Sequence, residues 1–431
     1  MVDSVPNTAA PSSELARARA DRHVIVHHPG TNHLAYELVA GVQEGGYACD
    51  FHTGFFYTPD GALARMVGAL PAALRARIER ELRRRAHGGV ASDRVHLRPW
   101  PEVVHVAAGR LGADQNRLAR IIGWRNNILD KAVARTIRRE RPHIVIGHDG
   151  SALYSARAAR EVGAAAILNQ VVGHVAAAHA LFHEEAVLSP AFAETMVETP
   201  AEIVARHEAE IREADGILVP SEYVRQTLLA RGASAERIFV LPYGVDINRF
   251  RPGQKQDRET FRILFVGQLS QRKGISYLLE AVKRLRLPNA ELVLVGKMLG
   301  SEQAFAPYRG VFRHVSHVPY HEVHRLFQDA DIFVYPSLHE GSAFATYEAM
   351  ASGLPIVTTL NSGSVARDGQ DGFIVPIRDV EALMARIETL YRDPALRAAM
   401  GEAARARACE FTWAQYRARL NLYLDKFALR R

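Results

Sequence analysis

Cysteine is scarce in this sequence, whose 431 residues include only Cys49 and Cys409. The two lie far apart and form no CxxC pair, so the sequence predicts neither a disulfide framework nor a zinc ribbon. No apolar stretch approaches the roughly 20 residues that span a bilayer. The first 23 residues also lack the apolar core that a secretory signal requires. We therefore expect a protein that works in the reducing cytoplasm.

Several binding signatures are also missing. The sequence has no Walker A loop and no GxGxxG after the first strand of either half, which argues against an NAD dehydrogenase. The formal charge of +7 nevertheless favours acidic partners, such as nucleotide phosphates or anionic lipid. Part of it lies in the arginine-rich stretch 74–89, which predicts either a solvated helix or a helix in peripheral contact with an anionic membrane. This stretch has no interleaved aromatics, so we expect no nucleic-acid partner.

Apolar segments of strand length alternate with helical segments in two series, which predicts two doubly wound α/β domains with parallel sheets. The expected strands of the first series are 23–28, 143–148, 164–170, 216–221 and 238–244. Those of the second series are 261–267, 290–296, 331–337, 355–359 and 372–376. A ligand cleft is expected between the two domains, at the carboxyl ends of the strands.

The polar, Pro- and Gly-containing stretch 248–260 is the best linker in the chain. We expect an arm at 1–21 that is disordered or loosely packed, because it is rich in Ala, Ser and Pro. The N-terminal domain then covers 22–250 and the C-terminal domain 251–411. An amphipathic helix at 412–431 has no strand after it.

Two stretches of the second half carry residues suited to a diphosphate. The first is "GQLSQRKGIS", where Gly267 and Gly274 allow a tight turn between strand and helix and Arg272 and Lys273 add two cations. Cations beside a helix N-terminus are well suited to hold a phosphate. Taken alone, this stretch is more simply interpreted as an ordinary surface turn.

The second stretch is "DIFVYPSLHEGSAFATYEAMASGLPIVTT", in which a strand is followed by a loop and a helix. The helix is expected to start between Ser342 and Phe344, so that its free N–H groups face the cleft. Glu340 would lie in the loop near a reacting sugar. Glu348, inside the helix, would accept the hydroxyls of a ribose. For the isolated pair, a helix-dipole role of the acids is the simpler interpretation.

Four ordered segments together resemble the retaining glycosyltransferases of family four, which have the GT-B fold of two facing Rossmann-like domains. They are "VPSEYVRQTLLARGASAERIFVLPYGVDINRFRP", "ILFVGQLSQRKG", "DADIFVYPSLHEGSAFATYEAMASGLPIV" and "DGFIVPIRD". The resemblance covers the chain from about residue 140 onward. It implies a retaining, metal-independent transfer of a sugar from a nucleotide-sugar donor to a saccharide, lipid-linked or small-molecule acceptor. Polysaccharide, glycolipid or glycoconjugate biosynthesis is the expected setting.

The resemblance also implies roles for residues. Glu340 would contact the donor sugar and Glu348 the ribose, while Arg272 and Lys273 would neutralise the leaving diphosphate and Lys273 would act in catalysis. The remaining donor-binding positions are Gly30, Gly267, Gly341, Ser342, Ala343 and Phe344. His174 falls where the family has a His close to the reacting sugar, and it is the third predicted catalytic residue with Glu340 and Lys273. The last helix would pack back across the N-terminal domain.

This sequence departs from the family at two places. Gln268 stands where the family often has Arg, which leaves Arg272 as the stand-in, and Ser342–Ala343 replaces Phe-Gly. Two alternatives therefore stay open: a nucleotide-sugar epimerase of the same architecture, and a nucleotide-sugar-binding protein without activity. The DxD-like Asp329 and Asp331 close a helix and open a strand, so we expect no metal site there. We expect no cofactor.

Overall fold

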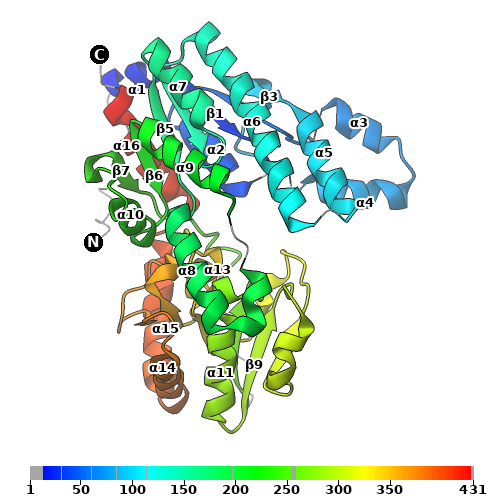
Figure 1. Cartoon of the computed structure of the whole chain (residues 1–431), viewed down its shortest axis with the longest axis vertical. Helices are drawn as coiled ribbons and strands as arrows, with labels where there is room; N and C mark the ends of the chain where they lie inside the picture. The colour runs from blue at the N-terminus through cyan, green and yellow to red at the C-terminus, as the bar shows by residue number, and fades with distance from the viewer. Residues whose placement is uncertain are drawn as a thin grey trace.

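The chain forms two domains, each built on one parallel sheet with helices on its faces (Figure 1). The computed structural model describes residues 13–30, 32–59, 61–83, 85–112, 114–196, 199–253 and 259–428. Residues 1–12 of the expected arm and 254–258 of the expected linker lie outside these ranges. No helix among the described residues is long and apolar enough to cross a membrane.

The N-terminal sheet has seven parallel strands in the order β3-β2-β1-β4-β5-β6-β7. The strands are β1 (His23–His28), β2 (Ala48–Thr53), β3 (Val95–Leu97), β4 (Ile144–His148), β5 (Ala165–Asn169), β6 (Gly216–Val219) and β7 (Ile238–Val240). Strands β1, β4 and β5 are buried apolar runs in the middle of the sheet, as expected of strands covered on both faces.

The C-terminal sheet has six parallel strands in the order β10-β9-β8-β11-β12-β13. They are β8 (Phe261–Val266), β9 (Ala290–Val295), β10 (Phe312–Val315), β11 (Ile332–Tyr335), β12 (Ile356–Thr359) and β13 (Gly372–Val375). The chain crosses over between β8 and β11, which are neighbours in the sheet, so their carboxyl ends place "GQLSQRKG" and "SLHEGSA" side by side.

Helices connect the strands in both domains. In the N-terminal half they are α1 (Ser13–Ala20), α2 (His33–Glu44), α3 (Ala62–Gly68), α4 (Ala72–Arg83), α5 (Pro99–Arg110), α6 (Gln115–Glu140), α7 (Leu153–Val162), α8 (Val175–Leu188), α9 (Ala201–Glu213) and α10 (Glu222–Leu229). The C-terminal half has α11 (Ile275–Leu285), α12 (Val323–Gln328), α13 (Phe344–Ala351), α14 (Val380–Arg392), α15 (Pro394–Cys409) and α16 (Trp413–Ala428). Short 3₁₀ turns include η2 (Pro190–Thr195), η4 (Gln271–Lys273) and η5 (Glu302–Tyr308).

The last helix, α16, returns to the N-terminal domain and packs on α2, where Asn421 donates a hydrogen bond to the Gly41 carbonyl at 2.9 Å. Residues 13–20, which the composition places in a loose arm, instead form α1 beside α16 (Figure 1). Arg19 of α1 makes a bidentate pair with Asp425 at 2.8 and 2.7 Å. A bidentate, buried pair of this kind fixes the helix in place.

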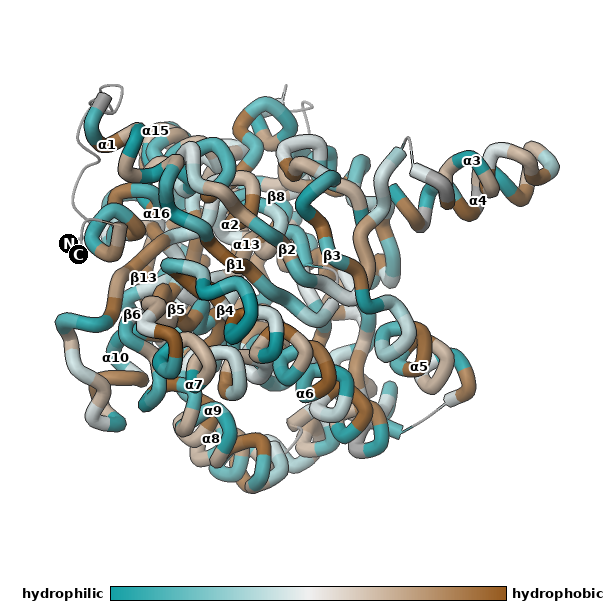
Figure 2. Tube along the Cα trace, turned by 90° about the horizontal axis from the view of Figure 1, so that it is seen from above, coloured by the Kyte–Doolittle hydropathy of each residue, from teal (hydrophilic) through white to brown (hydrophobic). Residues whose placement is uncertain are grey.

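Helices α3 and α4 project from the body of the N-terminal domain, and their surface mixes hydrophobic and hydrophilic residues (Figure 2). The expected arginine-rich helix is therefore observed, as α4, with Arg75, Arg80 and Arg83 exposed. Apolar side chains are exposed on the same projection, with Met66 at 70% and Leu74 at 46%.

Candidate functional site

The centre of the site is an acid held by two cations. Arg272 Nη1 lies 2.9 Å from Oε1 of Glu340, and the ammonium of Lys273 pairs with the same oxygen. Ser337 donates a hydrogen bond to this oxygen at 3.2 Å. Burial lowers the pKa of Lys273 to about 8, against the opposing effect of Glu340. The structure thus brings together three of the predicted residues in one buried cluster.

The two cations sit on the tight turn η4, which directly follows β8 and ends at Gly274. Gly274 has φ of +70°, and a Cβ there would lie 2.0 Å from the Pro336 carbonyl oxygen. Only glycine fits this position. Gly267 ends β8 and its N–H donates to the Val295 carbonyl, while Gln268 is exposed. The turn and the Glu340 loop are therefore packed against each other.

Helix α13 begins at Phe344, within the expected range, and its first turn opens beside the Glu340 loop. Ser342 Oγ donates to the Gly363 carbonyl at 2.6 Å, and the Ala343 N–H donates to the Ser362 carbonyl at 2.9 Å. Ser342 and Ala343 are therefore used to fix the loop. The Thr346 N–H donates to the Ala343 carbonyl at 3.0 Å, while the first N–H groups of a helix have no intrahelical partner and are suited to an anion.

The N-terminal domain closes against this loop at Gly341. A Cβ on Gly341 would lie 1.7 Å from the Val171 carbonyl oxygen, so the close approach requires glycine. Ser221 Oγ donates to the Gly341 carbonyl at 2.5 Å. Tyr243 stacks on Phe344 with ring centroids 4.8 Å apart. The Glu340 loop thus faces the loop that follows β5.

Glu348 lies farther along α13, beside Tyr320. The Tyr320 hydroxyl donates to Glu348 Oε1 at 3.4 Å, and the Arg249 guanidinium lies 4.9 Å from the Tyr320 ring. Burial raises the pKa of Glu348 to about 7. Glu340 and Glu348 therefore occupy different surroundings, one neutralised by cations and the other held by a phenol.

His174 is placed differently from the other predicted catalytic residues. Its ring accepts a hydrogen bond from the Ala176 N–H at 3.2 Å and so caps α8, while its backbone N–H donates to Thr227 Oγ1 at 2.9 Å. Burial, followed by the charge of Arg231, lowers its pKa. Within the described ranges, it makes no hydrogen bond to Glu340 or Lys273. Its catalytic role stays a prediction.

Gly30 lies in the loop after β1, next to Arg125. A Cβ on Gly30 would lie 3.3 Å from Arg125 Nη1, which itself pairs with Glu102 at 2.6 Å. Among the residues that the structure describes, no hydrogen bond joins Gly30 to the Lys273–Glu340 cluster. Its assignment to the donor phosphates also stays a prediction.

Two buried titratable residues were not identified from the sequence. His339 precedes Glu340, and its Nδ1 lies 2.6 Å from the hydroxyl of Tyr223 in the N-terminal domain. Burial lowers the pKa of His339 to about 4, so the ring is neutral. Asp149 follows β4 and has its pKa raised to about 8, first by burial and then by Glu210. Its position at a strand's carboxyl end was the available signal.

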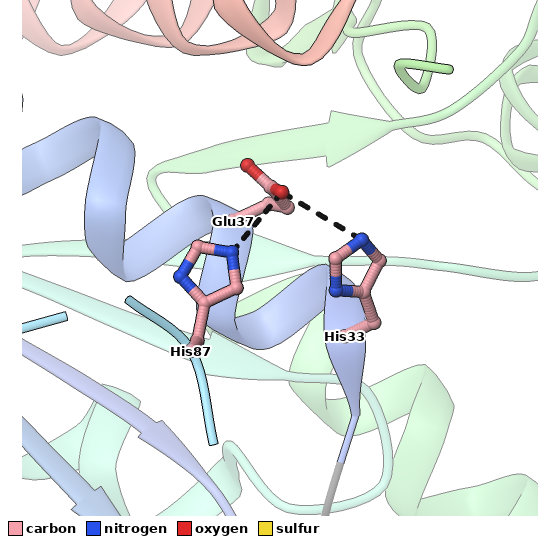
Figure 3. A group of neighbouring side chains, drawn as sticks. All are labelled: His33, Glu37 and His87. Atoms are coloured by element: carbon pink, nitrogen blue, oxygen red, sulfur yellow. Dashed lines mark hydrogen bonds and ion pairs between the residues drawn. The ribbon is translucent and has the colours of Figure 1, made fainter. Parts of the chain in front are cut away.

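A group of possible metal ligands lies on the N-terminal domain, where His33 and Glu37 of α2 meet His87 (Figure 3). Their Nε2 atoms lie 3.6 and 3.2 Å from Glu37 Oε1. The Gly89 N–H donates to Nδ1 of His87 at 3.2 Å, which assigns the ring proton to Nε2, the atom facing Glu37. Arg417 of α16 takes the other carboxylate oxygen at 2.6 Å. Hydrogen bonding and ion pairing therefore account for this group.

The DxD-like pair is also accounted for by neighbours in the C-terminal domain. Asp331 Oδ2 accepts the Arg262 N–H at 2.8 Å, and Asp329 pairs with the Arg262 guanidinium. Both acids thus fix the start of β8 to the start of β11. The expectation that Asp331 has a local structural role agrees with this geometry.

Comparison with known proteins places both halves in glycosyltransferase families. Residues 12–249 match Glycosyltransferase Family 4, and residues 246–407 match Glycosyl transferases group 1. The putative glycosyltransferase EpsD of Bacillus subtilis (strain 168) is 30% identical over 213 residues, which are 45% of this chain and 55% of EpsD. The putative colanic acid biosynthesis glycosyltransferase WcaL of Salmonella typhimurium is 27% identical over 284 residues, 62% of this chain and 66% of WcaL. The chain spans about half to two thirds of the length of these relatives.

Solved structures share the fold over nearly the whole chain. The crystal structure of Anabaena HepE in complex with UDP and glucose has a TM-score of 0.61 and 15% identity, and it covers 94% of this chain and 100% of the HepE chain. The predicted GT-B architecture of two Rossmann-like domains is thereby confirmed. Because the match to the first family covers more than half of the 431 residues, this chain belongs to Glycosyltransferase Family 4.

Proposed function

We propose that the chain transfers a sugar from a nucleotide-sugar donor to an acceptor hydroxyl, with retention at the anomeric carbon. The carrying observation is the convergence of Arg272 and Lys273 on Glu340 beside the start of α13. A diphosphate leaving group needs positive charge, and this turn supplies two cations next to free helix N–H groups. Family membership supports the same reaction class.

In the proposed reaction, the bond between the anomeric carbon and the leaving phosphate oxygen breaks. The bond to the acceptor oxygen forms on the same face of the sugar, and the acceptor proton passes to the leaving diphosphate. Arg272, whose side chain is 31% exposed, can turn from Glu340 to the phosphates, while the buried Lys273 keeps its place. We propose that no divalent metal is needed, because these two cations supply the charge.

Glu340 would then hold the donor sugar and Glu348 the ribose. Arg272, Lys273 and Ser337 all donate to Oε1 of Glu340, and these three contacts fix the orientation of the carboxylate. The Glu348 carboxylate has a neutral phenol beside it and can accept both hydroxyls of a ribose. The proposed acceptor is a saccharide or a lipid-linked saccharide, in keeping with the name of the relative WcaL.

Peripheral contact with an anionic membrane is part of the proposal. The projection formed by α3 and α4 exposes Met66, Leu74 and several arginines together. Apolar groups flanked by cations suit a bilayer surface with anionic lipid. Sedimentation with phosphatidylglycerol vesicles, but not with phosphatidylcholine vesicles, is the expected result. Loss of sedimentation in a Met66→Asp variant would assign the contact to this projection.

The decisive experiment is a binding and turnover panel with UDP, GDP, ADP and dTDP and their sugars. UDP sugars come first, because HepE was crystallised with UDP and with UDP-glucose. A cognate nucleotide at a hundredfold excess over Kd should stabilise the fold by about 2.7 kcal/mol. Nucleotide release that depends on an added acceptor supports the transferase. Sugar interconversion without an acceptor would instead support an epimerase, and binding without turnover a protein that has lost activity.

A further inference from the structure

A fully buried carboxylate of the N-terminal half is bound by three side chains of the C-terminal half. Glu185 of α8 is 0% exposed. Its oxygens accept hydrogen bonds from Gln271 Nε2 at 2.9 Å, from the Tyr277 hydroxyl at 3.0 Å and from Arg378 Nε at 2.5 Å. Burying a carboxylate is costly unless it is paired and hydrogen-bonded, and these three donors meet that requirement.

The chain after Glu185, from Ser189 through η2, also docks on the C-terminal half (Figure 1). The Gln271 N–H donates to Thr195 Oγ1 at 3.0 Å, and Gln271 Nε2 also donates to Ser189 Oγ at 3.1 Å. Phe192 packs edge-on against Phe305, with ring centroids 5.2 Å apart. Residues 184–195 thus belong to the N-terminal domain by sequence but bond to the C-terminal half, while α8 also contacts α9 of the N-terminal domain.

Gln271 connects this docking to the site, because it is the first residue of η4 and directly precedes Arg272 and Lys273. Glu185 fixes its side chain and Thr195 fixes its backbone N–H. The turn spans only three residues, so fixing its first residue sets the direction of the two cations that follow. The opposite end of α8 is capped by His174. One helix therefore links the predicted catalytic histidine to the phosphate-binding turn.

We propose that Glu185 is a positioning residue for the diphosphate of the donor. It holds Gln271, and through Gln271 it holds Arg272 and Lys273 at the place where the phosphates bind. This inference rests on the proposed function, since it assigns the turn to a diphosphate. Glu185 acts without touching the substrate.

The test compares Glu185→Gln with Glu184→Gln. Glu184 is the matched control, because it also pairs with Arg378, at 2.9 Å, but its side chain is 60% exposed. Two readouts are taken: amide hydrogen exchange of residues 270–276, and calorimetric binding of inorganic pyrophosphate, which needs no knowledge of the base. Glutamine keeps one accepting oxygen, but its NH2 group replaces the other and would face a buried donor. We expect Glu185→Gln to speed exchange and to weaken pyrophosphate binding by about tenfold, with Glu184→Gln unchanged.

Tyr277→Phe is a second variant in case Glu185→Gln does not fold. It keeps the Glu185 carboxylate and removes one of its hydrogen-bond donors. A smaller change in the same direction is expected. The inference is overturned if Glu185→Gln and Tyr277→Phe both show the same amide exchange and the same pyrophosphate affinity as Glu184→Gln. Binding of neither pyrophosphate nor any nucleotide by the wild type would overturn the proposed function, and with it the diphosphate assignment. In that case, faster amide exchange of residues 270–276 in Glu185→Gln would still show that Glu185 holds the turn η4 in place.

Discussion

The ammonium of Lys273 and the carboxylate of Glu340 form an ion pair in which both side chains are about nine-tenths buried. Arg272 shares the same carboxylate oxygen. Two cations this close repel each other, and the Arg272 charge contributes to the lowered pKa of Lys273. Glu340 therefore has a second consequence besides its proposed contact with the sugar: it keeps both cations in place while no phosphate is present.

Replacing Glu340 with Ala should reduce turnover by about a hundredfold to a thousandfold, because the sugar contact and the placement of both cations are lost together. The fold should also lose stability, since removing one partner leaves buried charge uncompensated. Acceptor-dependent nucleotide release and thermal unfolding measure the two effects. Glu236→Ala, an exposed acid of the N-terminal half, is the control. Turnover equal to that of the control would contradict the role of Glu340.

Lys273 should set an alkaline limit on donor binding. Its pKa is lowered to about 8, so the ammonium is present below pH 8 and is lost as the pH rises above it. Diphosphate affinity should therefore fall above pH 8. In Lys273→Arg the cation persists over this range, because a guanidinium does not deprotonate. Titration calorimetry from pH 7 to 9.5 should show a flat profile for the variant, and equal slopes for both proteins would contradict the assignment.

Glu348 should set the acid limit. With its pKa raised to about 7, the carboxyl is protonated below pH 7 in the free protein and must lose its proton to accept two ribose hydroxyls. Nucleotide affinity should then fall by up to about tenfold per pH unit below 7. The nucleotide's own phosphate also titrates in this range. Glu348→Gln separates the two contributions to the pH dependence of nucleotide affinity. The contribution of the phosphate remains in the variant, and that of the Glu348 carboxyl is lost.

Much of the fold could be predicted from hydrophobic patterning. Ten strands were expected, and each coincides with an observed strand, because their runs are apolar and covered on both faces. Nine agree with the expected bounds within two residues, whereas β7 ends at Val240, four residues before the expected end. Strands β2, β3 and β10 were not predicted from the sequence. β2 reads "ACDFHT" with polar residues in it, β3 has three residues, and β10 is half exposed. Strands towards the sheet edges need no continuous apolar run, so patterning does not reveal them.

Some residues of the candidate site were likewise predicted from the sequence, and others were not. Arg272, Lys273, Glu340 and the start of α13 were found because each lies within a short motif that directly follows a strand. Glu185 lies inside a helix and Asp149, although it directly follows β4, belongs to no recognised motif. Their surroundings come from contacts 86 and 61 residues away, with Gln271 and Glu210. The burial of an isolated acid depends on tertiary packing, which spacing along the chain does not report.

Asp149 gives a prediction for stability rather than for turnover. Its pKa of about 8 lies above the ordinary value of 3.8, so between these pH values the folded protein holds a proton that the unfolded chain has released. Stability from this group is therefore complete at acid pH and declines as the pH rises towards 8. Asp149→Asn removes the titration while keeping a similar shape.

The melting temperature of Asp149→Asn should accordingly exceed that of the wild type by a few degrees at pH 8, and by much less at pH 5. Asp93→Asn is the control, because it changes the formal charge equally at an exposed position. Thermal unfolding of the three proteins across this pH range provides the measurement. If Asp149→Asn and Asp93→Asn differ from the wild type by the same amount at every pH, the raised pKa of Asp149 is wrong. The protein would then hold an ionised acid at neutral pH beside the Val171 backbone, which Gly341 approaches.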